Sequence, residues 1–168
     1  MSPAQLLDAK PGDIVCDLCA APGGKSTQIA AQLQGRGVLV SNELYPARAR
    51  VLSQNFERMG IQNGVVLNEN TAHMAALFPG FFDKIMVDAP CSGEGMFRKD
   101  EETKEEWSPE QVQICADRQL EILGHAAQMC APGGEMVYST CTFSPEENES
   151  VIGRFLQEHA GFVLLEPG

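Results

Sequence analysis

The sequence predicts an α/β fold in which a mainly parallel sheet carries helices on both faces. Short apolar or β-branched runs alternate with longer helical patterns, and Gly, Pro or Asn marks each changeover. The chain has 168 residues, of which 43% are apolar and 21% are charged, the size and composition of one globular domain. We therefore expect residues 1–168 to form a single domain without internal repeats.

The elements follow from these patterns in chain order. Strands are expected at the short apolar runs, of which the last is the weakest: Ile14–Leu18, Val38–Ser41, Val65–Leu67, Lys84–Val87, Met136–Ser139 and Phe162–Leu165. Helices are expected at the longer periodic stretches: Lys25–Leu33, Pro46–Met59, Pro109–Cys130 and Pro145–His159. Three helix starts, at Ser2, Ser108 and Ser144, share a serine cap, a proline at the first helical position and Gln or Glu three residues after the serine.

The turn after the first expected strand, residues 17–26, indicates a ligand site. Its glycines let the backbone approach a ligand, and the following helix N-terminus favours a negative group. A phosphate-binding P-loop would need glycine where Cys19 stands, and the dinucleotide fingerprint G-x-G-x-x-G is absent. Glu43 closes the second strand twenty residues after Gly23, where a carboxylate can bind both ribose hydroxyls. S-adenosylmethionine, which has a nucleoside and a carboxylate but no pyrophosphate, fits; the alternative is a tight turn with an incidental glutamate.

Two further polar segments, residues 88–99 and 138–145, follow the fourth and fifth expected strands. Parallel strands present their carboxyl ends at one sheet edge, so these segments are expected on the ligand-binding rim. Each contains a cysteine, Cys91 in the first and Cys141 in the second. A lone cysteine near a strand end is more often a small hydrophobe, but two in polar loops favour thiol chemistry. Spacing alone leaves open which of the two would attack a substrate.

The remaining cysteines are predicted to be structural, and reduced thiols are expected throughout. Cys16 and Cys19 have no second pair with zinc-like spacing, so no metal site is expected. Cys115 and Cys130 belong to a helix whose apolar periodicity explains them. The three histidines are scattered and receive no role.

Composition also limits partners and location. The net charge of −11 argues against a free-standing domain that binds nucleic acid by electrostatics alone. The sequence has no apolar run of the ~20 residues that a membrane span needs and no signal-peptide profile at its start, so no membrane and a cytoplasmic protein are expected.

Three motifs together resemble the RNA 5-methylcytosine methyltransferase family, the Sun-type enzymes, and within it bacterial ribosomal RNA methyltransferases of the RsmF kind. The motifs are D-L-C-A-A-P-G-G-K-S, D-A-P-C-S-G-E-G, and S-T-C-T followed by P-E-E-N-E. The resemblance runs from Pro3 to about Glu166 and implies a Rossmann-like class I S-adenosylmethionine-dependent methyltransferase, here as a truncated catalytic core whose RNA-binding flanks are absent. The implied substrate is ribosomal RNA.

The resemblance also implies the roles of individual residues. Cys141 would attack carbon 6 of cytosine, Cys91 would serve product release, and Asp88 would face the reaction. Lys25, by its charge, is expected to favour the thiolate or orient the base. The residues implied in cofactor binding are Cys19, Ala20, Ala21, Pro22, Gly23, Gly24, Lys25, Glu43, Asn70 and Asp88. Asn70 stands where many relatives have aspartate, so the adenosine contact is expected to differ here.

Carbon 5 of cytosine is a poor nucleophile, and addition of a thiolate at carbon 6 makes it electron-rich enough to accept a methyl group. The base must be unstacked for this attack, so a single-stranded or flipped cytosine is expected. The long segment from Asp88 to Trp107, which includes Phe97, Arg98 and Lys99, is expected to act as a lid beside the substrate groove. Two alternatives remain: a methyltransferase acting on protein or a small molecule, and a cofactor-binding core inactive on its own.

Overall fold

The computed structural model describes residues 2–94 and 108–166, which belong to two compact units. The first unit comprises residues 1–88 and 125–138, and the second comprises residues 89–124 and 139–168. No helix in the described part of the chain is both long enough and apolar enough to cross a membrane.

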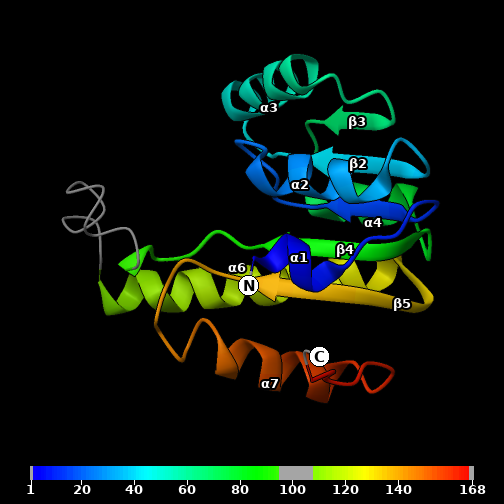
Figure 1. The fold of residues 1–168 in the computed structure, drawn as a ribbon. Coiled ribbons are helices and arrows are strands. Elements are labelled where there is room, and N and C mark those ends of the chain that lie inside the picture. The colour runs from blue at the N-terminus through cyan, green and yellow to red at the C-terminus, as the bar shows by residue number, and fades with distance from the viewer. Residues whose placement is uncertain (1, 95–107, 167–168) are drawn as a thin grey trace. The chain divides into compact units, whose positions relative to one another are not determined.

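The first unit is built on a five-stranded sheet with the order β3-β2-β1-β4-β5 (Figure 1). The strands are β1 (Ile14–Asp17), β2 (Val38–Asn42), β3 (Gly64–Leu67), β4 (Phe82–Asp88) and β5 (Cys130–Ser139). β1 pairs in parallel with β2 and with β4, β2 pairs in parallel with β3, and β5 runs in the same direction (Figure 1). The predicted parallel sheet is therefore confirmed.

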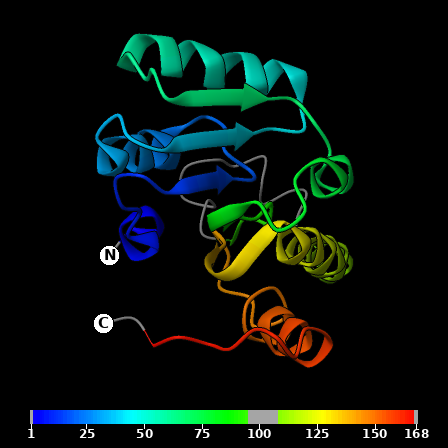
Figure 2. The same cartoon turned by 90° about the vertical axis from the view of Figure 1, so that its right-hand side faces the viewer.

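Helices lie on both faces of this sheet (Figure 2). They are α1 (Pro3–Leu7), α2 (Gly24–Leu33), α3 (Pro46–Met59) and α4 (Thr71–Leu77). Because side chains alternate along a strand, Val15, Leu39 and Met86 face one side and pack in a buried cluster with apolar residues of α1, α2 and α3. α4 lies on the opposite face, where the Thr71 hydroxyl and His125 Nδ1 are 2.8 Å apart. This core holds the carboxyl ends of the strands in fixed positions.

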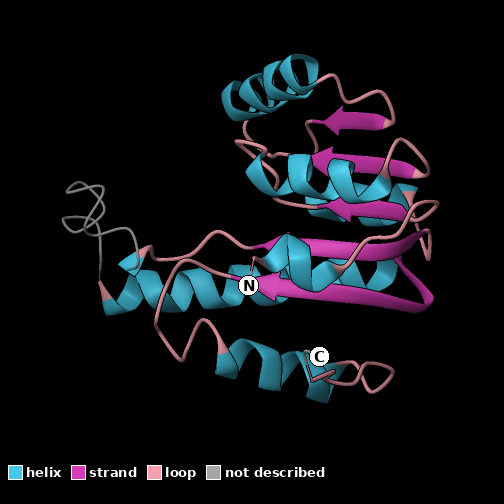
Figure 3. Ribbon diagram, in the orientation of Figure 1, coloured by secondary structure: helices cyan, strands magenta, loops and turns pink. Residues whose placement is uncertain are grey.

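The second unit contains most of α6 (Pro109–Met129), whose last residues belong to the first unit, and α7 (Glu149–Glu158). Figure 3 shows both helices and the loop that connects β5 to α7. Ser108 caps α6 as predicted, because its hydroxyl accepts a hydrogen bond from the Gln111 backbone amide at 3.1 Å. At the other end of the unit, Phe155 of α7 packs edge-on against Phe162.

Two sequence predictions in the second unit are wrong. Residues 162–165 form no strand, because this run pairs with no strand in the described part of the chain. The side chains of Val163, Leu164 and Leu165 are largely exposed. The last helix begins at Glu149 rather than Pro145. Residues 145–148 form a turn instead. The Glu147 amide donates to the Ser144 carbonyl at 3.2 Å, but the buried Glu147 side chain bonds Ser92 and Gln119 instead of closing a capping box with Ser144.

Two smaller differences concern element ends and one missed helix. Cys130 opens β5 instead of closing α6. α4 was not expected from its sequence, because its seven residues show too short an apolar pattern to indicate a helix. Its clearest local signal is Asn70, whose side chain accepts a hydrogen bond from the His73 backbone amide at 2.8 Å and so caps the helix.

Candidate active site

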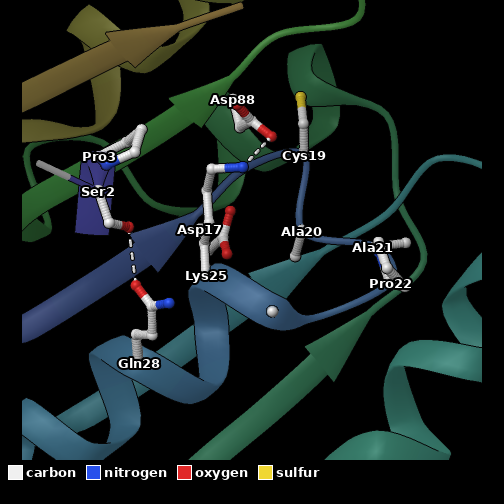
Figure 4. A pocket seen from close by; sticks show the side chains of 11 residues that line it. Ser2, Pro3, Asp17, Cys19, Ala20, Ala21, Pro22, Lys25, Gln28 and Asp88 are labelled. Carbon is white, nitrogen blue, oxygen red and sulfur yellow. Dashed lines mark hydrogen bonds and ion pairs between the residues drawn. The ribbon is translucent and has the colours of Figure 1, made fainter. Parts of the chain in front are cut away.

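The strand order places a ligand site between β1 and β4. In an open α/β sheet, ligands bind beyond the carboxyl ends of the strands where the strand order reverses. The order reverses here between β1, which ends at Asp17, and β4, which ends at Asp88. A cavity of about 400 Å³ lies at this point (Figure 4). Its lining residues are Ser2, Pro3, Asp17, Cys19, Ala20, Ala21, Pro22, Gly24, Lys25, Gln28 and Asp88.

The β1–α2 turn forms one wall of the cavity and is anchored from α3. The Arg48 guanidinium donates a hydrogen bond to the Ala21 carbonyl at 3.0 Å, and the Asn55 side chain donates one to the Pro22 carbonyl at 2.7 Å. Gly23 has φ +111°, and a Cβ there would lie 2.9 Å from Leu52. The backbone conformation therefore favours glycine, and a larger residue would also have to displace the Leu52 side chain. The turn leads the chain directly into α2, whose first amides have no partner within the helix.

The charged groups of the cavity are arranged around Asp17. Its side chain is fully buried, and burial raises its pKa from 3.8 to about 6, against the opposing effect of a hydrogen bond from Ser26. The second oxygen, Oδ1, is buried without a hydrogen-bond partner. Above it, Lys25 Nζ reaches Asp88 at 2.7 Å, in an ion pair whose side chains are about one-third exposed (Figure 4). The cavity thus presents an unsatisfied carboxylate oxygen to whatever binds there.

Seven of the ten predicted cofactor residues line the cavity, and three do not. Gly23 lies in the turn on the side packed against Leu52 and Asn55 of α3, and Asn70 caps α4. Glu43 is buried, accepts a hydrogen bond from the Tyr45 amide at 3.0 Å and lies 3.5 Å from the Arg48 guanidinium. Arg48 also donates a hydrogen bond to the Ala21 carbonyl. The Arg48 side chain therefore connects Glu43 to the β1–α2 turn.

The sequence reasoning overlooked Asp17 as a site residue. The available signal was a carboxylate closing an otherwise buried strand immediately before the glycine-rich turn. Cys16, predicted to be structural, is fully buried in β1. Cys19 reaches the cavity, but burial and the nearby carboxylates raise the pKa of its thiol to about 12, so it stays protonated.

The two cysteines singled out from the sequence come together in the second unit. Cys91 Sγ and Cys141 Sγ are 2.7 Å apart, and the Cys141 backbone amide donates to Cys91 Sγ at 3.3 Å. Cys141 is exposed, whereas Cys91 is half-buried. The hydrogen bond between the sulfurs, helped by burial, raises the pKa of Cys91 well above its ordinary value. Cys91 therefore keeps its proton, and Cys141 is the more exposed of the two sulfurs.

Part of the predicted substrate region lies outside the described residues. The segment 95–107, which includes Phe97, Arg98 and Lys99, lies outside the described residues. The predicted lid therefore stays a prediction. Cys115 lies buried on α6. Within residues 2–94 and 108–166, no three His, Cys, Asp or Glu side chains gather as ligands for a metal ion.

A parallel sheet in this order, with a cavity at its switch point, is the fold of Rossmann-like class I methyltransferases that use S-adenosylmethionine. The sequence profile described as 16S rRNA methyltransferase RsmB/F matches residues 4–167. The chain belongs to this family.

Comparisons with individual proteins agree with this assignment. The ribosomal RNA small subunit methyltransferase F of Serratia proteamaculans is 43% identical over 153 residues, which are 91% of this chain and 32% of that protein. The solved structure of NSun6 from Pyrococcus horikoshii with SFG has a TM-score of 0.84 at 30% identity and covers 93% of this chain and 40% of that one. A methyltransferase homolog protein from Pyrococcus horikoshii has a TM-score of 0.80 at 35% identity, over 92% of this chain and 48% of that one. The chain spans about a third of the length of the curated relative.

Proposed function

We propose that residues 1–168 are the catalytic core of an enzyme that methylates carbon 5 of cytosine in ribosomal RNA. The observation that carries this proposal is the pair of thiols, with Cys91 Sγ and Cys141 Sγ 2.7 Å apart in polar loops, in a chain of the RsmB/F family. Covalent activation of a pyrimidine needs one sulfur to attack and a second ionisable group to complete the release. A methyltransferase whose substrate atom is already nucleophilic would need neither an attacking thiol nor a second ionisable group beside it.

The cavity of the first unit fits S-adenosylmethionine. Its buried Asp17 Oδ1 lacks a partner, and the amino group of the ligand's methionine part can supply one. The free amides at the start of α2 suit the ligand's carboxylate, and Glu43 suits the ribose hydroxyls. When bound, the ligand supplies an electrophilic methyl group on a sulfonium. The residues of this chain that would hold it are Asp17, Cys19, Ala20, Ala21, Pro22, Gly23, Gly24, Lys25, Glu43, Asn70 and Asp88.

The two thiols divide the work on the base. Cys141 attacks carbon 6 as a thiolate, which makes carbon 5 nucleophilic. After methylation, the bond between Cys141 Sγ and carbon 6 breaks, and its electron pair returns to sulfur. The carbon 5 proton leaves, and the electron pair of that C–H bond restores the ring double bond. Cys91, which holds a proton at the start, gives it to the departing sulfur and takes the carbon 5 proton.

Asp88 and Lys25 are proposed to act on the cytosine ring. During attack, negative charge moves toward the ring nitrogen and carbonyl, where a hydrogen-bond donor or a cation stabilises it, while an acceptor can hold the exocyclic amine. Asp88 would bond the ring nitrogen or the exocyclic amine, and Lys25 would favour the thiolate or orient the base. Their 2.7 Å ion pair holds the Lys25 side chain against Asp88 at the cavity.

The substrate is proposed to be a single-stranded or flipped cytosine, because a stacked base exposes neither face of carbon 6 to a thiolate. The net charge of −11 indicates that the RNA is bound mainly by other parts of the full-length protein. An enzyme of ribosomal RNA is expected in the cytoplasm.

The test is nucleoside mass spectrometry of ribosomal RNA after incubation with methyl-labelled S-adenosylmethionine. The protein is this chain joined to the regions that flank the matching segment in a curated relative. Label in 5-methylcytosine is expected. Label only in protein or in small molecules would instead support the alternative substrate classes, and cofactor binding without transfer would support a binding core.

A further inference from the structure

The second unit contains a fully buried carboxylate that has no role in the proposed reaction. Glu147 lies in the turn between Cys141 and α7, and its residue exposure is 0%. A buried carboxylate is costly unless hydrogen bonds satisfy it. Glu147 accepts a hydrogen bond from the Ser92 backbone amide at 3.0 Å, another from the Ser92 hydroxyl, and a third from the Gln119 side-chain amide at 2.7 Å.

These bonds fix the chain on both sides of Cys91. Ser92, which follows Cys91, is held by Glu147 through its amide and its hydroxyl. Pro90, which precedes Cys91, accepts a hydrogen bond at 2.9 Å from the same Gln119 amide that binds Glu147. Cys91 therefore has little freedom to move, although its own thiol makes none of these bonds.

The loop of Cys141 is fastened to the same turn. Asn148, the neighbour of Glu147, donates to the Thr142 carbonyl at 3.2 Å and accepts from the Thr140 hydroxyl at 2.7 Å. Thr140 and Thr142 flank Cys141. One short turn, residues 147–148, thus holds the neighbours of both thiols.

We propose that Glu147 is a positioning residue that, together with Gln119, keeps Cys91 Sγ within proton-transfer distance of Cys141 Sγ. That this short distance serves product release rests on the proposed function, in which Cys91 completes that release. The clamp itself is a property of the chain and can be tested without RNA. Loss of the clamp would leave Cys141 able to attack but would separate it from the group that completes the reaction.

The substitution Glu147→Gln tests the clamp with little change in shape. It replaces one acceptor oxygen with a donor. In place of Oε2 that donor faces both the Ser92 amide and the Gln119 amide, and in place of Oε1 it faces the Ser92 hydroxyl. The readout is the rate at which diamide, a thiol oxidant, joins Cys91 and Cys141 in a disulfide in the 168-residue chain. Peptide mass spectrometry identifies the linked cysteines. Because the rate depends on the effective concentration of one thiol near the other, we expect it to fall by about tenfold.

Glu146→Gln is the matched control, since the neighbouring Glu146 is exposed and its carboxylate accepts a hydrogen bond from the Ser144 hydroxyl at 2.7 Å. We expect it to oxidise at the wild-type rate. Should Glu147→Gln fail to fold by circular dichroism, Gln119→Met removes both amide bonds while keeping side-chain length, and the same slowing is expected. Oxidation at the wild-type rate in a folded Glu147→Gln or Gln119→Met chain would overturn the proposal.

A second readout uses the chain joined to a relative's flanking regions. Glu147→Gln is expected to accumulate a covalent RNA adduct as Cys91→Ala does, whereas a loss of stability alone would lower adduct and methylation together. Equal losses of both would count against the positioning role. If neither Cys91→Ala nor Cys141→Ala affects adducts, the proposed function fails, while the oxidation rates still decide whether Glu147 positions the thiol.

Discussion

One wall of the cavity in the first unit is a backbone turn, whereas the thiol pair of the second unit is held by side-chain hydrogen bonds. Ala20 to Gly24 line or support the cavity with few polar side-chain atoms, on a turn fixed between β1 and α2. Cys91 and Cys141 lie in loops, and Glu147, Gln119 and Asn148 bond to the residues next to them. Backbone sites tolerate single side-chain changes better than side-chain networks do. Cofactor binding and thiol chemistry are therefore expected to be separable by mutation.

The largest expected effect comes from the thiols and would sharpen this separation. In the chain joined to a relative's flanking regions, Cys141→Ala should abolish both methylation and the covalent RNA adduct. Cys91→Ala should let the adduct form and accumulate, because attack survives and release is impaired. Denaturing gels measure the adduct, and calorimetry should find unchanged cofactor affinity in both variants. An adduct that persists without Cys141 and vanishes without Cys91 would reverse the two roles.

Removing the flanking regions should affect RNA binding much more than cofactor binding. The 168-residue chain alone should bind S-adenosylmethionine with an affinity similar to that of the joined protein. Its RNA affinity and methyl transfer at physiological salt should be lower by at least about tenfold, because a chain with net charge −11 repels a polyanion. Calorimetry and filter binding compare the two proteins. Equal rates of RNA methylation would contradict this expectation.

Asp17 allows a test of the cavity by pH. Its pKa is about 6 in the folded chain and 3.8 without burial. Protonation of Asp17 therefore stabilises the folded state, and this stabilisation is complete below pH 4. That stabilisation is lost as the pH rises through 6. Asp17→Asn should therefore raise the free energy of unfolding at pH 7.5 by up to about 3 kcal/mol, with no gain below pH 4. Urea unfolding at the two pH values measures this difference.

The same substitution should weaken cofactor binding, since the carboxamide cannot balance the ligand's ammonium. Binding to the wild-type chain should release a proton near pH 6, because the ligand's positive charge favours ionised Asp17. Calorimetry in buffers with different ionisation enthalpies measures the proton. A wild-type affinity for Asp17→Asn without proton release would remove Asp17 from the binding site.

The smallest expected effect is that of Glu43, which lies outside the cavity lining. Glu43→Ala should lower cofactor affinity by roughly tenfold or more, since a charge-assisted hydrogen bond contributes ~1.5–3 kcal/mol. Part of this loss would act through Arg48, which connects Glu43 to the Ala21 carbonyl. Glu57→Ala, on the exposed side of α3, is the control and should bind normally. Calorimetry that finds no difference between the two variants would exclude a ribose contact at Glu43.

The sequence by itself determined the order of elements, the parallel sheet and the loops that carry the motifs. Strands and long helices are fixed by local apolar patterns, so Pro46–Met59 was predicted to the residue. The glycine-rich turn could also be located, because its composition follows from the conformation it adopts. The motifs at the ends of β1, β4 and β5 indicated the class of enzyme through their resemblance to a family.

Only the tertiary structure decided which side chains meet. The burial of Asp17, the capping role of Asn70 and the turn at Pro145 in place of a helix depend on neighbours distant in sequence. The same holds for the 2.7 Å separation of two sulfurs that are 50 residues apart in the chain. Local patterns report what a segment prefers, whereas burial and hydrogen bonding are set by the partners that folding brings together. For that reason a carboxylate such as Glu147, which the sequence predicts to close a helix cap with Ser144, becomes the buried link between two loops.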